Sequence, residues 1–149
     1  ALPMDQIPRC EATVTLRVVE GYQAAEFSAE SRGLFYGSAY QVSPRSDRMG
    51  YRLEGNAVAA PAGERFSEGI AYGAVQVPPD GQPIVLLNDR QTIGGYPKLG
   101  TVLSLDCWKL AQCVPGAKVC FEVISLEAAQ AAVKEFTATR EATALKRST

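Results

Sequence analysis

The chain has 149 residues, the length of one domain that can bury a core without disulfides or metals. Its 15 basic and 16 acidic residues almost cancel and form no block of one sign, so the charge gives no support for nucleic acid or an anionic membrane as a partner. It contains no histidine, which excludes Ser-His-Asp and Cys-His nucleophile systems, and histidine metal sites, within this polypeptide.

The chain carries no visible targeting segment. No apolar run approaches the ~20 residues that a spanning helix needs, and no basic stretch followed by a hydrophobic one opens the sequence, so we expect a cytoplasmic protein. The chain begins at Ala1, which favours a fragment of a longer subunit. The four cysteines are spaced too far apart for paired zinc ligation and are interpreted as buried small hydrophobes: Cys10, Cys107, Cys113 and Cys120.

Regular structure is predicted to begin after a leader or linker at residues 1–12. Residues 13–20 alternate apolar and polar side chains with the period of two that is typical of a half-buried strand. Residues 27–36 follow, with Ser28 as a plausible N-cap, and predict a short helix.

The middle of the chain predicts further short strands. Residues 40–42 and 49–53 flank a polar turn that contains Pro, Ser and Asp. Residues 74–77 and 83–87 are apolar runs joined by Pro-Pro-Asp-Gly-Gln, and Asp-Gly between such runs is a strong signal of a β-hairpin. The two runs are therefore predicted to pair with each other.

The last third predicts a strand and a long helix. Residues 99–105 form another apolar run, residues 105–114 can hold a helical turn, and residues 118–124 alternate like a final strand. Ser125 then caps an amphipathic helix with apolar side chains three or four residues apart, which begins the segment 126–149.

Together these elements predict a mainly β fold. Many short strands, regular Gly and Pro punctuation and a single long helix favour a closed β-barrel over a βαβ fold. We place the barrel at residues 13–125, with the helix and tail at 126–149.

One candidate site is the polar insert that follows the second hairpin strand. Asp89, Arg90 and Gln91 are costly at the exit of a buried strand unless they pair with each other or line a cavity. Gly94 and Gly95 would let backbone N–H groups approach a ligand closely. The alternative is an Asp89–Arg90 pair that closes the barrel end around the Gly-Gly turn, and the insert matches no phosphate-binding loop.

A second candidate is the loop that precedes and enters residues 49–53. Arg45, Arg48 and Arg52 surround Asp47 and could hold a carboxylate or phosphate through planar guanidinium groups, although a solvated loop is the alternative. Lys98 could contact an anion, or it is simply exposed. By spacing alone, Gln76 and Gln82 only flank the hairpin turn, and Trp108 is interpreted as a packing residue.

Four motifs in order carry a resemblance to a known family. They are residues 46–55 (SDRMGYRLEG), 67–70 (SEGI), 76–83 (QVPPDGQP) and 89–98 (DRQTIGGYPK). They resemble the C-terminal half of the biotin-dependent carboxyltransferase family, which includes allophanate hydrolase subunit 2, the C subunit of 5-oxoprolinase and the carboxyltransferase domain of urea carboxylase. The similarity extends from about Thr13 to Ala129.

The resemblance implies a cyclophilin-like barrel and an amide-type substrate. Family subunits have two such barrels, this chain would supply the second, and the cleft would lie between the halves. Family members transfer a carboxyl group from carboxybiotin to urea, or open the ring of 5-oxoproline with ATP and a partner subunit. The implied catalytic residues are Asp89, Arg90 and Gln91. The implied substrate-binding residues are Asp47, Arg48, Gln76, Thr92, Gly94, Gly95, Tyr96 and Lys98.

The resemblance also implies which components lie on other polypeptides. Neither a biotinyl-lysine motif nor an ATP-binding loop is present here, so ATP or carboxybiotin is expected on partner polypeptides. The expected partners are the N-terminal half of the subunit, a partner subunit like allophanate hydrolase subunit 1 or the B subunit of 5-oxoprolinase, and a small amide substrate. The chain departs from the family at Ile93, which is usually Thr, and at Asn88, which is usually small. A regulatory protein-binding module is the alternative function.

Overall fold

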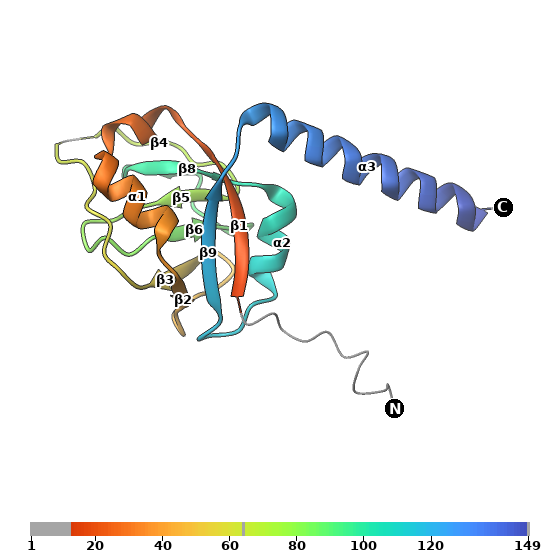
Figure 1. Cartoon of the computed structure of the whole chain (residues 1–149). Helices are drawn as coiled ribbons and strands as arrows, with labels where there is room; N and C mark the ends of the chain where they lie inside the picture. The colour runs from red at the N-terminus through yellow and green to blue at the C-terminus, as the bar shows by residue number, and fades with distance from the viewer. Residues whose placement is uncertain (1–12, 64, 149) are drawn as a thin grey trace.

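The computed structural model describes residues 13–63 and 65–148, and the expected leader and Cys10 lie outside them. Within these residues seven strands close into a barrel in the order β1-β8-β5-β6-β3-β2-β9 (Figure 1). Their bounds are β1 Thr13–Glu20, β2 Tyr40–Val42, β3 Gly50–Glu54, β5 Ala74–Gln76, β6 Ile84–Leu86, β8 Lys98–Val102 and β9 Lys118–Val123. The predicted closed barrel is therefore confirmed.

The barrel closes where the first strand meets the last. β1 pairs in parallel with β9, from Thr13 opposite Lys118 to Val18 opposite Val123, and antiparallel with β8. The predicted hairpin is also confirmed, because β5 and β6 pair antiparallel with Val75 opposite Val85. Closure leaves no free edge on the barrel sheet, which protects its strands from pairing with another chain.

A second, two-stranded sheet lies outside the barrel. β4 (Glu68–Gly69) pairs antiparallel with β7 (Ile93–Gly94), and we call this the β4–β7 ribbon. The sequence did not predict it, because two-residue strands are too short to show a period.

Two of the helices carry the caps that the sequence predicted. Ser28 Oγ accepts a hydrogen bond of 3.0 Å from Ser31 N at the start of α1 (Ala29–Gly37). Ser125 Oγ accepts one of 3.1 Å from Ala128 N at the start of α3 (Leu126–Ser148). The remaining helices are the 3-10 helix η1 (Tyr22–Glu26) and α2 (Ser104–Ala111), where the sequence predicted only a helical turn.

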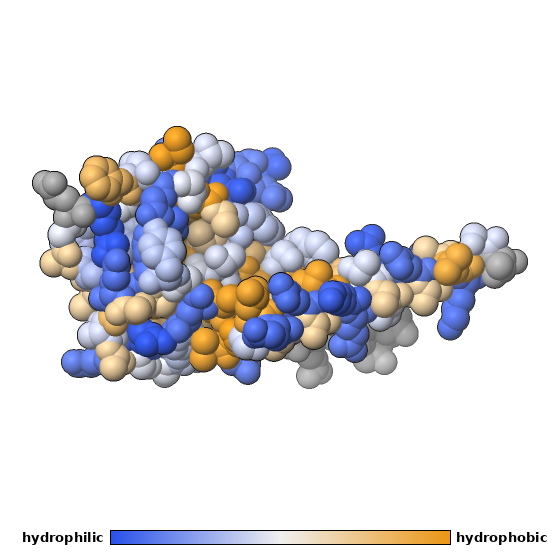
Figure 2. All heavy atoms as spheres, turned by 90° about the horizontal axis from the view of Figure 1, so that it is seen from above, coloured by the Kyte–Doolittle hydropathy of each residue, from blue (hydrophilic) through white to orange (hydrophobic). Residues whose placement is uncertain are grey.

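Helix α3 extends away from the barrel (Figure 1). Of its described residues, Ala129 is the one that is buried. Phe136 packs on Trp108 of α2 with ring centroids 5.5 Å apart, and Val133 is 38% exposed. Figure 2 shows apolar surface gathered between the barrel and the start of α3. The predicted helix is present, but much of its apolar face is uncovered. In the described residues no helix is long and apolar enough to cross a membrane.

The core fills the barrel and the space under α1. Phe35 of α1 stacks on Phe121 of β9 at a centroid distance of 4.3 Å, so the helix covers one opening of the barrel. The alternation along the strands decides which side chains enter the core. The fully buried strand residues include Leu16, Val18, Leu53, Val75, Val85 and Leu99.

A buried ion pair joins α2 to β1. The Asp106 carboxylate is fully buried and accepts hydrogen bonds from Arg17 N, Nε and Nη2 at 2.8, 2.9 and 2.8 Å. Burial raises the pKa of Asp106, but the hydrogen bonds from Arg17 outweigh it and hold this pKa below its usual value. Cys107 beside it is buried, and Cys113 and Cys120 are partly buried.

Candidate functional site

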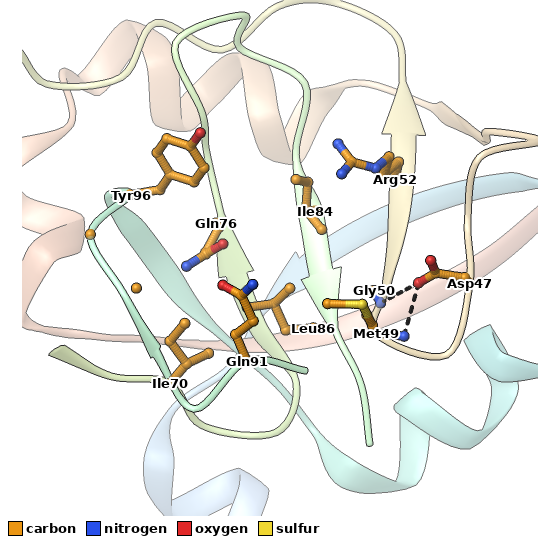
Figure 3. Close-up of a pocket in the computed structure, with 12 residues that line it drawn as sticks. Asp47, Met49, Gly50, Arg52, Ile70, Gln76, Ile84, Leu86, Gln91 and Tyr96 are labelled. Carbon is orange, nitrogen blue, oxygen red and sulfur yellow. Dashed lines mark hydrogen bonds between the residues drawn. The ribbon is translucent and has the colours of Figure 1, made fainter. Parts of the chain in front are cut away.

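A pocket of about 460 Å³ lies between the outer face of the barrel and the β4–β7 ribbon (Figure 3). Val85 of β6 points into the core, so its neighbours Ile84 and Leu86 face outward by the period of two and form part of the pocket. We call this the ribbon pocket. Its lining residues are Asp47, Met49, Gly50, Arg52, Ile70, Gln76, Ile84, Leu86, Gln91, Gly94, Gly95 and Tyr96.

The amide of Gln76 lies at the floor of this pocket. Gln76 is only 6% exposed, yet its side chain makes no hydrogen bond to any residue in the described part of the chain. The amide oxygen and nitrogen are nonetheless open to the pocket, because Arg65 Nε is the one described side-chain atom that is both buried and without a partner. A ligand in the pocket can therefore replace the water at this amide. An amide offers one acceptor oxygen and two N–H donors. Gln91 adds a second, exposed amide on the ribbon side of the pocket (Figure 3).

The ribbon approaches Gln76 because a glycine stands at position 94. A Cβ atom there would lie 3.0 Å from Gln76 Nε2 and 2.6 Å from Ile70 Cδ1. The glycine therefore allows the ribbon to lie directly against the amide.

The opposite rim of the pocket carries charge. Asp47 Oδ1 accepts hydrogen bonds from Met49 N at 2.9 Å and Gly50 N at 3.3 Å, so this carboxylate shapes the turn that leads into β3. Arg52 lines the pocket from β3, and its guanidinium has no ion pair among residues 13–63 and 65–148. The pocket thus combines apolar walls with two amides, one carboxylate and one guanidinium.

Two of the three residues implied as catalytic do not line the pocket. Asp89 forms an ion pair with Arg48 of 3.2 Å, and both side chains are more than half exposed. Arg90 Nε donates to the carbonyl of Ile70 at 3.0 Å, and its Nη1 donates to that of Leu87 at 3.3 Å. The alternative of an Asp89–Arg90 pair is therefore wrong, because Arg90 binds backbone oxygens instead.

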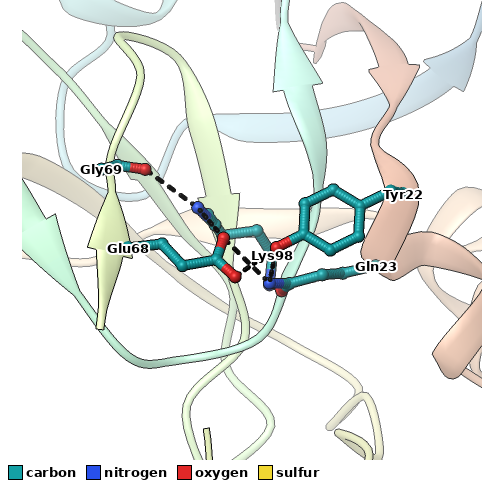
Figure 4. A network of polar contacts seen from close by, with 5 residues as sticks. All are labelled: Tyr22, Gln23, Glu68, Gly69 and Lys98. Carbon is teal, nitrogen blue, oxygen red and sulfur yellow. Dashed lines mark hydrogen bonds and ion pairs between the residues drawn. The ribbon is translucent and has the colours of Figure 1, made fainter. Parts of the chain in front are cut away.

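Two further residues that were expected to bind the ligand also lie outside the ribbon pocket. Thr92 is exposed, and its carbonyl accepts a hydrogen bond of 2.9 Å from Ile70 N directly beside the ribbon. Lys98 Nζ donates to the Gly69 carbonyl at 3.0 Å and pairs with Glu68 at 3.4 Å (Figure 4).

The structure thus brings together only some of the expected site residues. Of the residues implied by the resemblance, those that line the ribbon pocket are Asp47, Gln76, Gln91, Gly94, Gly95 and Tyr96. Those outside it are Arg48, Asp89, Arg90, Thr92 and Lys98. The sequence missed the apolar lining by Ile70, Ile84 and Leu86. The alternation around Val85 could have indicated that Ile84 and Leu86 face outward.

Comparison with known proteins relates the chain to one domain family. Residues 1–123 match the family model described as carboxyltransferase domain, subdomain A and B. The chain is 43% identical over 115 residues to the C subunit of 5-oxoprolinase from Escherichia coli (strain K12), a match that covers 76% of this chain and 37% of that protein. It is 39% identical over 133 residues to the C subunit of 5-oxoprolinase from Haemophilus influenzae, covering 84% of this chain and 43% of that one.

The chain therefore spans about two-fifths of the length of these curated relatives. A solved structure, the Kluyveromyces lactis urea carboxylase, is 22% identical with a TM-score of 0.71, and the match covers 80% of this chain and 12% of that one. At this identity the likeness shows a shared fold.

Proposed function

Because this chain belongs to the carboxyltransferase domain family of subdomains A and B, we propose that it is the C-terminal barrel of a subunit that acts on an amide-type small molecule. The active site would be shared with the N-terminal half of the same subunit. Two lining residues, Met49 and Tyr96, are 44% and 49% exposed, so the pocket is open on one side. An open pocket suits completion by another polypeptide.

The reaction that we favour is ring opening of 5-oxoproline, with ATP and a partner subunit. The relatives that support it share 39–43% identity with this chain and are named as the C subunit of 5-oxoprolinase. Carboxyl transfer from carboxybiotin to urea is the second candidate, because the urea carboxylase structure has the same fold. In both reactions ATP or carboxybiotin would come from partner polypeptides.

The observation that carries the proposal is the amide of Gln76, which faces the pocket and has no hydrogen-bond partner among the described residues. A cyclic or linear amide presents one carbonyl acceptor and at least one N–H donor, which Gln76 can meet with its own N–H and carbonyl groups. Gln91 lines the same pocket, and its amide N–H could stabilise negative charge that develops on the substrate carbonyl oxygen. Arg52 could hold a substrate carboxylate at the rim.

The remaining expected residues take supporting roles in this proposal. Arg90 holds the Ile70 carbonyl and so supports the ribbon side of the pocket. The exposed Asp89–Arg48 pair lies outside the pocket, where it could contact the N-terminal half or the partner subunit.

The test uses the complete subunit purified with its partner subunits. Turnover is measured with 5-oxoproline and with urea, in the presence of ATP, with and without bicarbonate and a biotin carrier. ATP-dependent loss of 5-oxoproline without bicarbonate supports the favoured reaction, and bicarbonate-dependent loss of urea supports carboxyl transfer. Activity on neither, with the partner still bound, would replace the proposal by a regulatory binding module.

The role of Gln76 is tested by Gln76→Leu, which keeps the size of the side chain and removes both polar groups. Loss of about two hydrogen bonds, each worth about 1–1.5 kcal/mol, should lower kcat/KM by about 30- to 150-fold. Gln41→Leu on β2 is the matched control, because Gln41 is exposed and does not line the pocket. Equal activity of the two variants would refute the role of Gln76.

A further inference from the structure

The β4–β7 ribbon has too little pairing of its own to fix its position. It consists of two register pairs, Glu68 opposite Gly94 and Gly69 opposite Ile93, and it lies outside the barrel sheet. An isolated two-stranded sheet is marginally stable at best in water. Nevertheless, the ribbon and the loops beside it supply one wall of the ribbon pocket, namely Ile70, Gln91, Gly94, Gly95 and Tyr96. Contacts from elsewhere must therefore hold this wall in place.

A polar network holds the first strand of the ribbon against the barrel (Figure 4). Lys98 Nζ, at the start of β8, donates to the Gly69 carbonyl at 3.0 Å and pairs with Glu68 Oε2 at 3.4 Å. Tyr22 Oη of η1 donates to Glu68 Oε1, and Gln23 Nε2 lies 3.4 Å from Glu68 Oε2. We call the side chains of Tyr22, Gln23, Glu68 and Lys98 the Glu68 clamp.

The clamp is tied to the backbone of the barrel. Gln23 is only 5% exposed, and its Oε1 accepts a hydrogen bond of 2.8 Å from Lys98 N. The Lys98 side chain is 17% exposed, so most of its length is packed rather than solvated. The same amide of Gln23 also donates to Tyr22 Oη at 3.0 Å. The polar groups of the clamp thus satisfy one another within the network.

Charge in the clamp is balanced. The hydrogen bond from Tyr22 is the main cause that lowers the pKa of Glu68, and Lys98 adds to it. The same hydrogen bond raises the pKa of Tyr22, because ionisation would place two negative charges together. At neutral pH, Glu68 is therefore a carboxylate that faces one ammonium group. The Lys98 ammonium is already engaged, and Lys98 does not line the ribbon pocket.

A second cation holds the next residue of the chain. Arg90 Nε donates to the carbonyl of Ile70 at 3.0 Å, directly after the Gly69 carbonyl that Lys98 binds. Two consecutive carbonyls of one segment are thus each bound by a cationic side chain. Such charge-assisted hydrogen bonds are stronger than neutral ones, so they suit a segment with few other contacts.

We propose that Glu68 and Lys98 are positioning residues, which fix the β4–β7 ribbon at the distance from the barrel that the ligand of the ribbon pocket requires. The nature of that ligand rests on the proposed function, whereas the contacts that define the clamp do not depend on it. Lys98 acts through the ribbon wall and does not touch the substrate. Loss of the clamp should leave the barrel intact and loosen one wall of the pocket.

The clamp is tested first without reference to activity, by hydrogen exchange of the complete subunit with its partner subunits. In Glu68→Gln and Lys98→Met, amides of segments 66–70 and 92–96 should exchange about tenfold faster or more, while β6 amides keep their rates. Lys118→Met on β9 is the matched control, since Lys118 is exposed and outside the clamp. Unchanged exchange of the ribbon in both clamp variants would overturn the proposal.

The consequence for the site is tested by kinetics on whichever of 5-oxoproline or urea is turned over. Lys98→Met should raise KM about tenfold and also lower kcat by up to about tenfold, because the mobile wall carries Gln91, which is proposed to stabilise charge on the substrate. Lys98→Arg keeps the cation and should restore most of the affinity. A large fall in kcat with normal ribbon exchange would instead make Lys98 a substrate contact and overturn its positioning role. If neither substrate is turned over, the proposed function is refuted, but the hydrogen-exchange rates still test whether the clamp holds the ribbon.

Discussion

Replacing Asp106 with asparagine should destabilise the barrel more than any comparable change of an exposed carboxylate. The Asp106 side chain is fully buried, whereas its partner Arg17 is 32% exposed. In the Asp106→Asn variant the new amide oxygen can still accept a hydrogen bond from Arg17 N. Its NH₂ group, however, would face the Arg17 guanidinium, which is also a donor, so at least one charge-assisted hydrogen bond is lost.

The magnitude follows from the burial of the two partners. Removing one partner of a buried ion pair costs about 3–5 kcal/mol, and a hydrogen bond to a charged group is worth about 1.5–3 kcal/mol. Water can reach the Arg17 guanidinium after the change, which places the expected loss at the lower end, about 3 kcal/mol. For a chain of this length that corresponds to a fall in Tm of about 6–12 °C.

The pH dependence has a definite sign. The folded-state pKa of Asp106 lies below its unfolded value, because the Arg17 hydrogen bonds outweigh the cost of burial. The pair therefore contributes its full stability above the unfolded pKa of about 3.9, and this contribution is lost as pH falls through the folded pKa. The difference between Asp106 and the Asn variant should be constant from about pH 5 to pH 8 and should shrink below about pH 4.

Urea denaturation at pH 7 measures the loss as a shift in the transition midpoint. Asp89→Asn is the matched control, because its ion pair with Arg48 is 53% and 87% exposed and should contribute less than about 0.5 kcal/mol. A loss below about 1 kcal/mol for Asp106→Asn, or equal losses for both variants, would refute the argument from burial.

Three further outcomes are expected from single positions. The Gly94→Ala variant should fold, but its new Cβ would lie 3.0 Å from the Gln76 amide and displace it. The affinity for the ligand, measured by titration calorimetry, should therefore fall about tenfold. Unchanged affinity would contradict the close approach of Gly94 to Gln76. Gly100→Ala should cost more than about 2 kcal/mol in urea denaturation, because its Cβ would lie 2.5 Å from the backbone oxygen of Val19, and a loss within about 0.5 kcal/mol would disprove this. Burial raises the pKa of the Cys107 thiol to about 11, so the thiol should react with iodoacetamide at pH 8 only after the chain unfolds. Mass spectrometry measures the alkylation. Rapid labelling of the native protein would show that Cys107 is accessible.

Local patterns in the sequence were sufficient to predict most of the barrel. The period of two defined β1 over residues 13–20, and the Asp-Gly turn joined β5 to β6. Ser28 and Ser125 both cap the helices that they were expected to cap. These features depend on interactions between residues a few positions apart, which is why the sequence alone determines them.

The candidate site shows where local patterns cease to decide the structure. Asp89 and Arg90 are neighbours in the sequence, yet Asp89 pairs with Arg48 and Arg90 binds the carbonyls of Ile70 and Leu87. Lys98 likewise binds Glu68, thirty positions away. A polar side chain takes whichever partner the folded chain brings near, and the sequence does not show that partner.

The sequence by itself determined the mainly β composition of this protein, the positions of most barrel strands and of α1 and α3, the absence of histidine chemistry, and the motifs that identify its family. Only the tertiary structure decided that Gln76 would present an unpartnered amide to an open pocket. This depends on the register of β5 with β6 and on how closely the β4–β7 ribbon approaches the barrel through Gly94. Both are set by contacts between residues far apart along the chain, because burial and partner choice are properties of the whole fold.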